Sequence, residues 1–75
     1  MELTKNTLDD FKVGNDYRYS QIPEYSTEEI EVNDYGAEYF GSNAIHIRDN
    51  KTLTDVWLIY VGQGNEGIFK CVYKD

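Results

Sequence analysis

Alternation of apolar and polar residues is clearest in the C-terminal half of the chain, where it predicts strands. Residues 44–48 read AIHIR, and we expect Ile45 and Ile47 to point inward. Residues 53–61 read LTDVWLIYV and are apolar at both parities after Asp55. Such a run is typical of a central strand that is buried on both sides, with its tryptophan in the core.

A third strand is predicted at residues 68–74, which read IFKCVYK. Strict alternation places Phe69, Cys71 and Tyr73 on one side and the lysines on the other. Short polar turns join the three strands, which favours an antiparallel meander. The central strand then needs cover, and we expect the N-terminal segment to pack on one of its faces.

That N-terminal segment is predicted to contain a short helix. Leu8 and Phe11 lie three residues apart on one face, residues 6–7 offer a capping side chain, and Gly14 suits a stop. An extended entry into a strand at residues 17–20 is the alternative.

The segment that follows favours a hairpin. Residues 27–32 alternate like a strand, residues 33–36 (NDYG) read as a turn, and residues 37–40 return. The alternative is a helix that begins with a capping box, with Ser26 as N-cap and Glu29 three residues later.

Together these elements predict an α+β fold in a single domain, residues 1–75. The expected architecture is a small antiparallel sheet of four to five strands with a short N-terminal helix, and an SH3-like small β-barrel is the alternative. At 75 residues the chain is near the lower limit for a single unaided core.

Composition narrows the expected location of the protein. No run approaches the roughly 18 to 20 apolar residues of a membrane span, and MELTKNTLDD lacks the apolar core of a signal peptide. Cys71 is the single cysteine, which excludes an intrachain disulfide. We expect a cytoplasmic protein.

One motif resembles a dinucleotide-binding fingerprint. Residues 62–67, GQGNEG, have the spacing G-x-G-x-x-G directly after a predicted strand. That fingerprint requires a following helix whose N-terminus receives the pyrophosphate. The residues that follow alternate like a strand, so we interpret GQGNEG as a hairpin loop.

The sequence also lacks the residues that known catalytic and metal-binding motifs require. Aligning Gly36 with the invariant glycine of an EF-hand places Tyr35 and Ser42 where oxygen ligands, one of them a bidentate glutamate, are required. His46 and Cys71 are expected on opposite faces, so they form no dyad. We expect no metal, no cofactor, no catalytic residue and no enzymatic activity.

The net charge of −7 is concentrated in one segment. No Lys or Arg lies between Arg18 and Arg48, whereas the run PEYSTEEIEVNDYGAEYF at residues 23–40 carries six carboxylates. The rest of the chain has eight acids and seven bases. A field of this sign repels nucleic acid and anionic membrane and attracts basic protein surfaces.

Tyrosines interleave with these acids and offer contact area at low entropic cost. The predicted partner-binding residues are Glu24, Tyr25, Glu28, Glu29, Glu31, Asp34, Tyr35, Glu38 and Tyr39. On a strand, Glu29 and Glu31 share one side about 6.6 Å apart. Duplex DNA carries one charge per about 1.7 Å, so six carboxylates match about 10 Å of duplex.

In length, in its pI of about 4.5, in the run EYSTEEIEVNDYGAEY and in its lack of a catalytic set, the chain resembles the small acidic inhibitors encoded by phages and mobile elements, anti-CRISPR proteins among them. The resemblance is one of class and implies an inhibitor that occupies a basic nucleic-acid-binding site on a DNA-acting enzyme, such as an RNA-guided nuclease, in the cytoplasm of a bacterial host. The alternative function is a non-catalytic adaptor module that binds a protein or peptide through its tyrosines.

Overall fold

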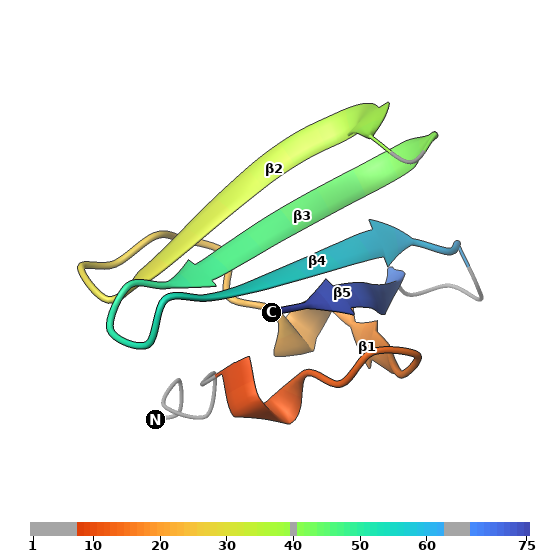
Figure 1. The fold of residues 1–75 in the computed structure, drawn as a ribbon. Coiled ribbons are helices and arrows are strands. Elements are labelled where there is room, and N and C mark those ends of the chain that lie inside the picture. The colour runs from red at the N-terminus through yellow and green to blue at the C-terminus, as the bar shows by residue number, and fades with distance from the viewer. Residues whose placement is uncertain (1–7, 40, 63–66) are drawn as a thin grey trace.

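The structure is a computed structural model that describes residues 8–39, 41–62 and 67–75, with the backbone alone at residues 37–39. Five strands form one antiparallel sheet in the order β1-β5-β4-β3-β2 (Figure 1). In chain order the elements are η2 (Leu8–Asp10), β1 (Asp16–Arg18), η3 (Tyr19–Gln21), β2 (Ile30–Tyr39), β3 (Ser42–Asp49), β4 (Thr54–Tyr60) and β5 (Ile68–Lys74).

The predicted antiparallel meander is confirmed. β3, β4 and β5 follow one another in the sheet, and β2 and β1 add the two edges. The α+β class is met only loosely, because the helical elements in the described part of the chain are isolated 3-10 turns. The sheet is also open, with β1 and β2 at opposite edges, so the SH3-like barrel is not the architecture formed.

The N-terminal segment covers one face of the sheet, as predicted, although through a single 3-10 turn. The N–H of Phe11 donates to the carbonyl of Leu8 at 3.1 Å, which brings both side chains to the same side. Each of the two is only 2 % exposed. The core that they complete consists of Leu8, Phe11, Ile22, Ile45, Ile47, Val56, Leu58, Phe69 and Cys71.

The predicted turn at residues 33–36 is wrong, because β2 continues through it. Asp34 pairs with Ile45 and Gly36 pairs with Ala44, which leaves Tyr35 as an extra residue in a β-bulge. Gly36 adopts a positive φ of 62°, and its N–H donates to Asp34 Oδ1 at 2.9 Å. The same residue types serve turns and bulges, which explains the error. The capping-box helix is likewise wrong, because residues 26–29 are irregular and the chain enters strand β2 at Ile30.

A second bulge, in β5, reverses one further prediction. Trp57 pairs with Tyr73 and Leu58 pairs with Cys71, so Val72 is the extra residue. The insertion carries Tyr73 to the face opposite Cys71, where its side chain is 48 % exposed. Strict alternation had placed these two residues on the same side.

The segment after β4 contains the glycine-rich motif. Its residues 63–66 lie outside the described residues, and Gly62 precedes them with a φ of 66°. Ile68–Lys74 form strand β5, antiparallel to β4, which confirms that no helix follows the motif. No helix in the described ranges is long and apolar enough to cross a membrane.

Candidate protein-binding surface

One face of the sheet packs on the core and the other carries a row of polar and aromatic side chains. This open face bears His46, Arg48, Asp55 and Trp57, which alternate with core residues along β3 and β4, and Tyr73, which the bulge in β5 brings to the same face. His46 pairs with Trp57, and Arg48 pairs with Asp55, across β3 and β4. The predicted burial of β4 on both sides is therefore wrong, since Trp57 is only half-buried and lies outside the core cluster.

Trp57 is the centre of a row of stacked rings. The ring of His46 stacks on it with centroids 4.7 Å apart, and the ring of Tyr35 stacks with centroids 5.4 Å apart. Tyr35 reaches this row from β2, where it is the bulged residue. Stacked cross-strand aromatics fix one another's rotamers and present a rigid apolar surface.

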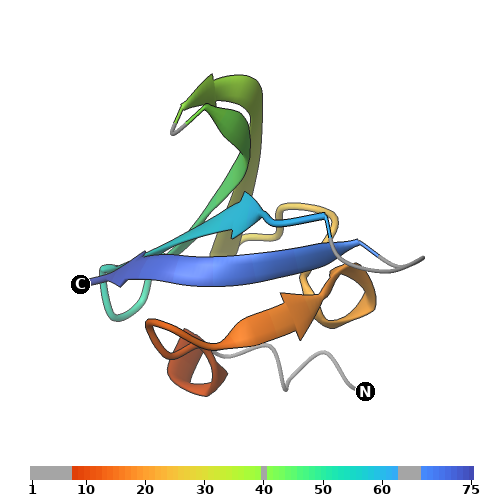
Figure 2. The ribbon, with the colours of Figure 1, turned by 90° about the vertical axis from the view of Figure 1, so that its right-hand side faces the viewer.

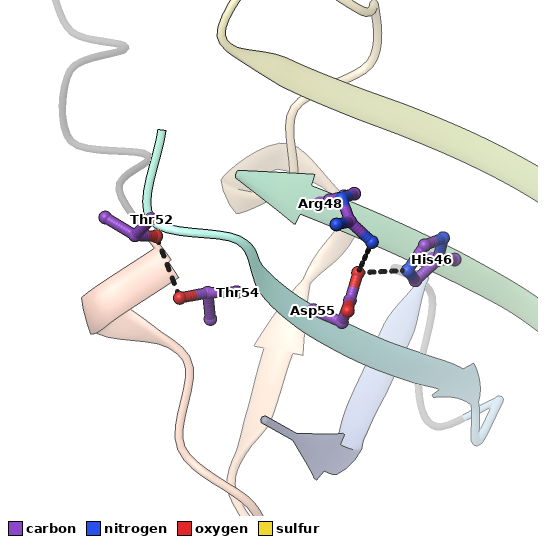
Figure 3. Close-up of polar contacts among 5 residues, drawn as sticks. All are labelled: His46, Arg48, Thr52, Thr54 and Asp55. Carbon is purple, nitrogen blue, oxygen red and sulfur yellow. Dashed lines mark hydrogen bonds and ion pairs between the residues drawn. The ribbon is translucent and has the colours of Figure 1, made fainter. Parts of the chain in front are cut away.

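His46 also belongs to a charged cluster with Arg48 and Asp55, whose side chains are drawn in Figure 3. Asp55 Oδ1 lies 2.9 Å from His46 Nε2, which donates to it, and 3.4 Å from Arg48 Nη1. The side chains of His46 and Asp55 are 16 % and 22 % exposed, so this contact is partly shielded from solvent. Asp55 therefore fixes the orientation of the imidazole that stacks on Trp57.

These side chains surround an open hollow of about 570 Å³, lined by His46, Arg48, Asp55, Trp57, Val72 and Tyr73. Its lining combines ring surfaces with the carboxylate of Asp55 and with the basic groups of His46 and Arg48, which already contact that carboxylate. Within the described residues, no three His, Cys, Asp or Glu side chains gather as metal ligands. The hollow offers aromatic contact area and hydrogen-bonding groups at its border.

The five predicted acidic residues whose side chains the structure describes are exposed, but they do not share one face. Glu31 pairs with Arg48 and lies on the open face, whereas Asp34 pairs with Ile45 and lies on the opposite face. Glu24, Glu28 and Glu29 precede β2. We refer to Glu24, Glu28, Glu29, Glu31 and Asp34 together as the acidic rim, because they follow the β2 edge of the sheet and the segment that leads into it.

Basic side chains neutralise few of the carboxylates of the acidic rim. Among ion pairs within the described residues, it takes part in one, between Glu29 and Lys51 at 3.7 Å, with both side chains more than 60 % exposed. An exposed pair of this kind contributes almost nothing to stability. Its remaining carboxylates face solvent and keep the local field negative.

The predicted tyrosines have different settings. Tyr25 is 78 % exposed in the segment before β2. Tyr35 is half-buried in the row of stacked rings. Tyr39 pairs with Ser42 through the backbone, and the side chains of Tyr39 and Glu38 lie outside the description.

Cys71 lies in the core, as predicted from its parity with Phe69. Its side chain is 1 % exposed, and burial raises the pKa of its thiol. His46 lies on the other face of the sheet, which confirms that the two residues do not form a couple.

Sequence reasoning missed the residues at the centre of the open face. The signal was present, because Asp55 and Trp57 alternate with Val56 and Leu58. Comparisons of the chain with protein-family models, with curated proteins and with solved structures found no match.

Proposed function

We propose that this protein binds a basic surface of another protein with its open face and acidic rim. We further propose that the partner is a DNA-acting enzyme, such as an RNA-guided nuclease, whose nucleic-acid-binding site the protein occupies. The observation that supports this best is the one-sided sheet. One face is packed, and the other presents stacked rings beside an acidic edge that takes part in one exposed ion pair among the described residues.

This arrangement matches the anatomy of protein interfaces. Their centres are enriched in Trp and Tyr that exclude water, and their margins are polar and charged. Trp57 and Tyr73 supply such a centre, and Glu31 joins it to the rim on the same face. A negative margin also accelerates encounter with a basic partner and selects against acidic ones.

The amount of charge sets the size of the site that the protein would occupy. Six carboxylates in the central segment match about 10 Å of duplex at one charge per about 1.7 Å. That length suits a pocket in which arginines read a few base pairs, as in the motif-reading site of an RNA-guided nuclease. Carboxylates bind such arginines through paired hydrogen bonds.

One observation favours the alternative of a tyrosine-based adaptor. Tyr25 is 78 % exposed before β2, which is the exposure of a side chain available to a peptide partner. An adaptor of this kind would lose binding on Tyr25→Ala and be insensitive to removal of the rim charges.

The test is displacement of duplex DNA. A panel of purified RNA-guided nucleases is loaded with labelled target duplex, and fluorescence anisotropy follows release as the protein is added. We expect release from at least one nuclease. Release should be weaker at about 200 mM salt than at about 50 mM. Replacing Glu28 and Glu31 with Gln should weaken release by roughly tenfold.

A matched control has Asp9 and Asp10 replaced with Asn. These residues are exposed in η2, on the covered side of the sheet, and the replacement removes the same number of charges. It should change release less than about twofold. Equal loss from both variants, or no release from any nuclease, would contradict the proposal.

A further inference from the structure

The two edges of the sheet differ, and only β2 offers a long one. β1 is three residues long, which is a common way to blunt an edge. β2 is ten residues long, and the segment before it covers the start of its outer side. The N–H of Thr27 donates to the carbonyl of Ile30 at 2.7 Å, and Ser26 Oγ accepts the N–H of Val32 at 2.9 Å.

Beyond Val32 this outer side is open. Along an antiparallel strand, the N–H and carbonyl of one residue point to one neighbouring strand and those of the next residue point to the other. The N–H and carbonyl of Asp34 therefore point outward, as those of Ile30 and Val32 do. Its N–H and carbonyl make no hydrogen bond to another described residue on that side. Figures 1 and 2 show the far part of the β2–β3 hairpin projecting from the sheet with no described segment beside its outer edge.

We propose that this free edge of β2 accepts an extended basic segment of the partner as a sixth strand. The inference rests on the proposed function and specifies how the basic partner engages the acidic rim. In such strand addition, main-chain hydrogen bonds supply affinity and alternate side chains supply specificity.

The placement of the acids on both faces of β2 fits this occupant. An added strand lies about 4.8 Å from β2, and its side chains point alternately to the two faces. Glu31 lies on the open face and Asp34 on the opposite one, so basic side chains on either side of the added strand meet a carboxylate. A flat binding face would not need acids at both parities.

The same charges disfavour pairing with a second copy of the chain. Two β2 edges brought together would place like charges opposite one another, which destabilises a sheet. Charge on an edge strand is a common protection against self-association. A basic strand removes that repulsion and replaces it with ion pairs.

Tyr35 favours an arginine at the position of the added strand that points to the open face. Its ring is half-buried and is held by stacking on Trp57, next to the position of an added strand. An arginine in that strand would lie against the ring and gain cation–π attraction. The preferred segment therefore has an arginine that points to the open face and a second basic residue that points to the opposite face.

The test uses two blocked peptides of arginine and threonine, with arginine at both odd and even positions, that differ only in their backbone. One has free amides, and the other carries N-methyl groups along both edges, which keep the charge and remove the hydrogen-bond donors. We expect the free peptide to bind at least about tenfold more tightly. It should also slow hydrogen exchange of the Asp34 amide by about tenfold, measured by NMR.

Two variants of Asp34 separate charge from backbone pairing. Asp34→Asn keeps the outward N–H and an acceptor for Gly36, whereas Asp34→Pro removes the N–H at an edge position that tolerates proline. Proline should weaken peptide binding about tenfold more than asparagine does.

Equal affinity for the two peptides, or no change at the Asp34 amide, would overturn the added strand and leave the proposed function standing. Binding by neither peptide would also overturn it, while DNA displacement decides the proposed function independently. Concentration-dependent protection of the Asp34 amide without peptide would assign the edge to a second copy and would equally overturn the proposal.

Discussion

Asp55 is the side chain on which the open face depends most. Its carboxylate accepts from His46 at 2.9 Å and lies 3.4 Å from Arg48, while His46 in turn stacks on Trp57. One acid thus contacts two basic side chains and orients the row of rings. Its role is inferred to be positional, because it satisfies the groups around it.

Replacement of Asp55 with Asn tests this role. The variant keeps an acceptor but loses the charge that both basic side chains share, so we expect destabilisation of about 0.5–1 kcal/mol in urea unfolding. Asp9→Asn, at an exposed position in η2, should stay within about 0.5 kcal/mol of the parent. The positional role is contradicted if the two variants have equal stability.

Cys71 gives a prediction about pH. Burial raises the pKa of its thiol, so the unfolded chain loses the proton first as pH rises. The stability that this difference provides is complete below the ordinary value of 9.0 and is lost as pH rises from there toward the raised pKa. The gap in unfolding free energy between the parent and Cys71→Ala should therefore narrow above about pH 9. A gap that stays constant with pH would contradict the burial effect.

At the scale of elements, the strands were predictable and their irregularities were not. Alternation and apolar runs located β3, β4 and β5, because each presents two or more core side chains at a spacing of two residues. Bulges insert one residue without a distinctive local pattern, and the bulge in β5 moved Tyr73 to the open face. The acids and tyrosines of the central segment stay a prediction as binding residues, whereas the centre of the open face was missed because residues 53–61 were interpreted as a strand buried on both sides.

The bulge at Gly36 can be tested directly. Its φ of 62° is a left-handed conformation, and a Cβ added there would meet no heavy atom within 4 Å. Gly36→Ala should therefore destabilise by about 1–2 kcal/mol through backbone strain alone. Gly36→Asn should cost less, because asparagine adopts this conformation more readily. Urea unfolding that shows equal costs, or no cost for alanine, would contradict this account of the bulge.

At the scale of the whole molecule, a thin layer completes the core. Leu8, Phe11 and Ile22, from short segments without an α-helix, cover one face of the sheet. The expected helix is replaced by the 3-10 turn Leu8–Asp10, which buries Leu8 and is followed directly by the buried Phe11. The other face is left to the row of rings and the charged cluster, which makes it available for contact.

Charge is distributed on the same scale. The central segment holds six of the seven net negative charges, and the fold arranges its acids along one edge of the sheet instead of over one face. The concentration of negative charge in the central segment could be predicted from the sequence, because it depends only on position along the chain. Its division between the two faces of β2 was missed because residues 33–36 were interpreted as a turn, although Glu31 and Asp34 have opposite parity on a continuous strand.

The central claim is that binding uses the open face, and two tyrosines of equal exposure test it. Tyr73 is 48 % exposed on the open face, whereas Tyr19 is 46 % exposed and contacts the core residue Phe69 at 6.0 Å between centroids. The measurement is DNA release from a nuclease that the parent protein displaces, compared for Tyr73→Ala and Tyr19→Ala. We predict at least about tenfold weaker release for Tyr73→Ala and less than about twofold change for Tyr19→Ala. Unchanged release for Tyr73→Ala, or an equal loss in both variants, would contradict the claim.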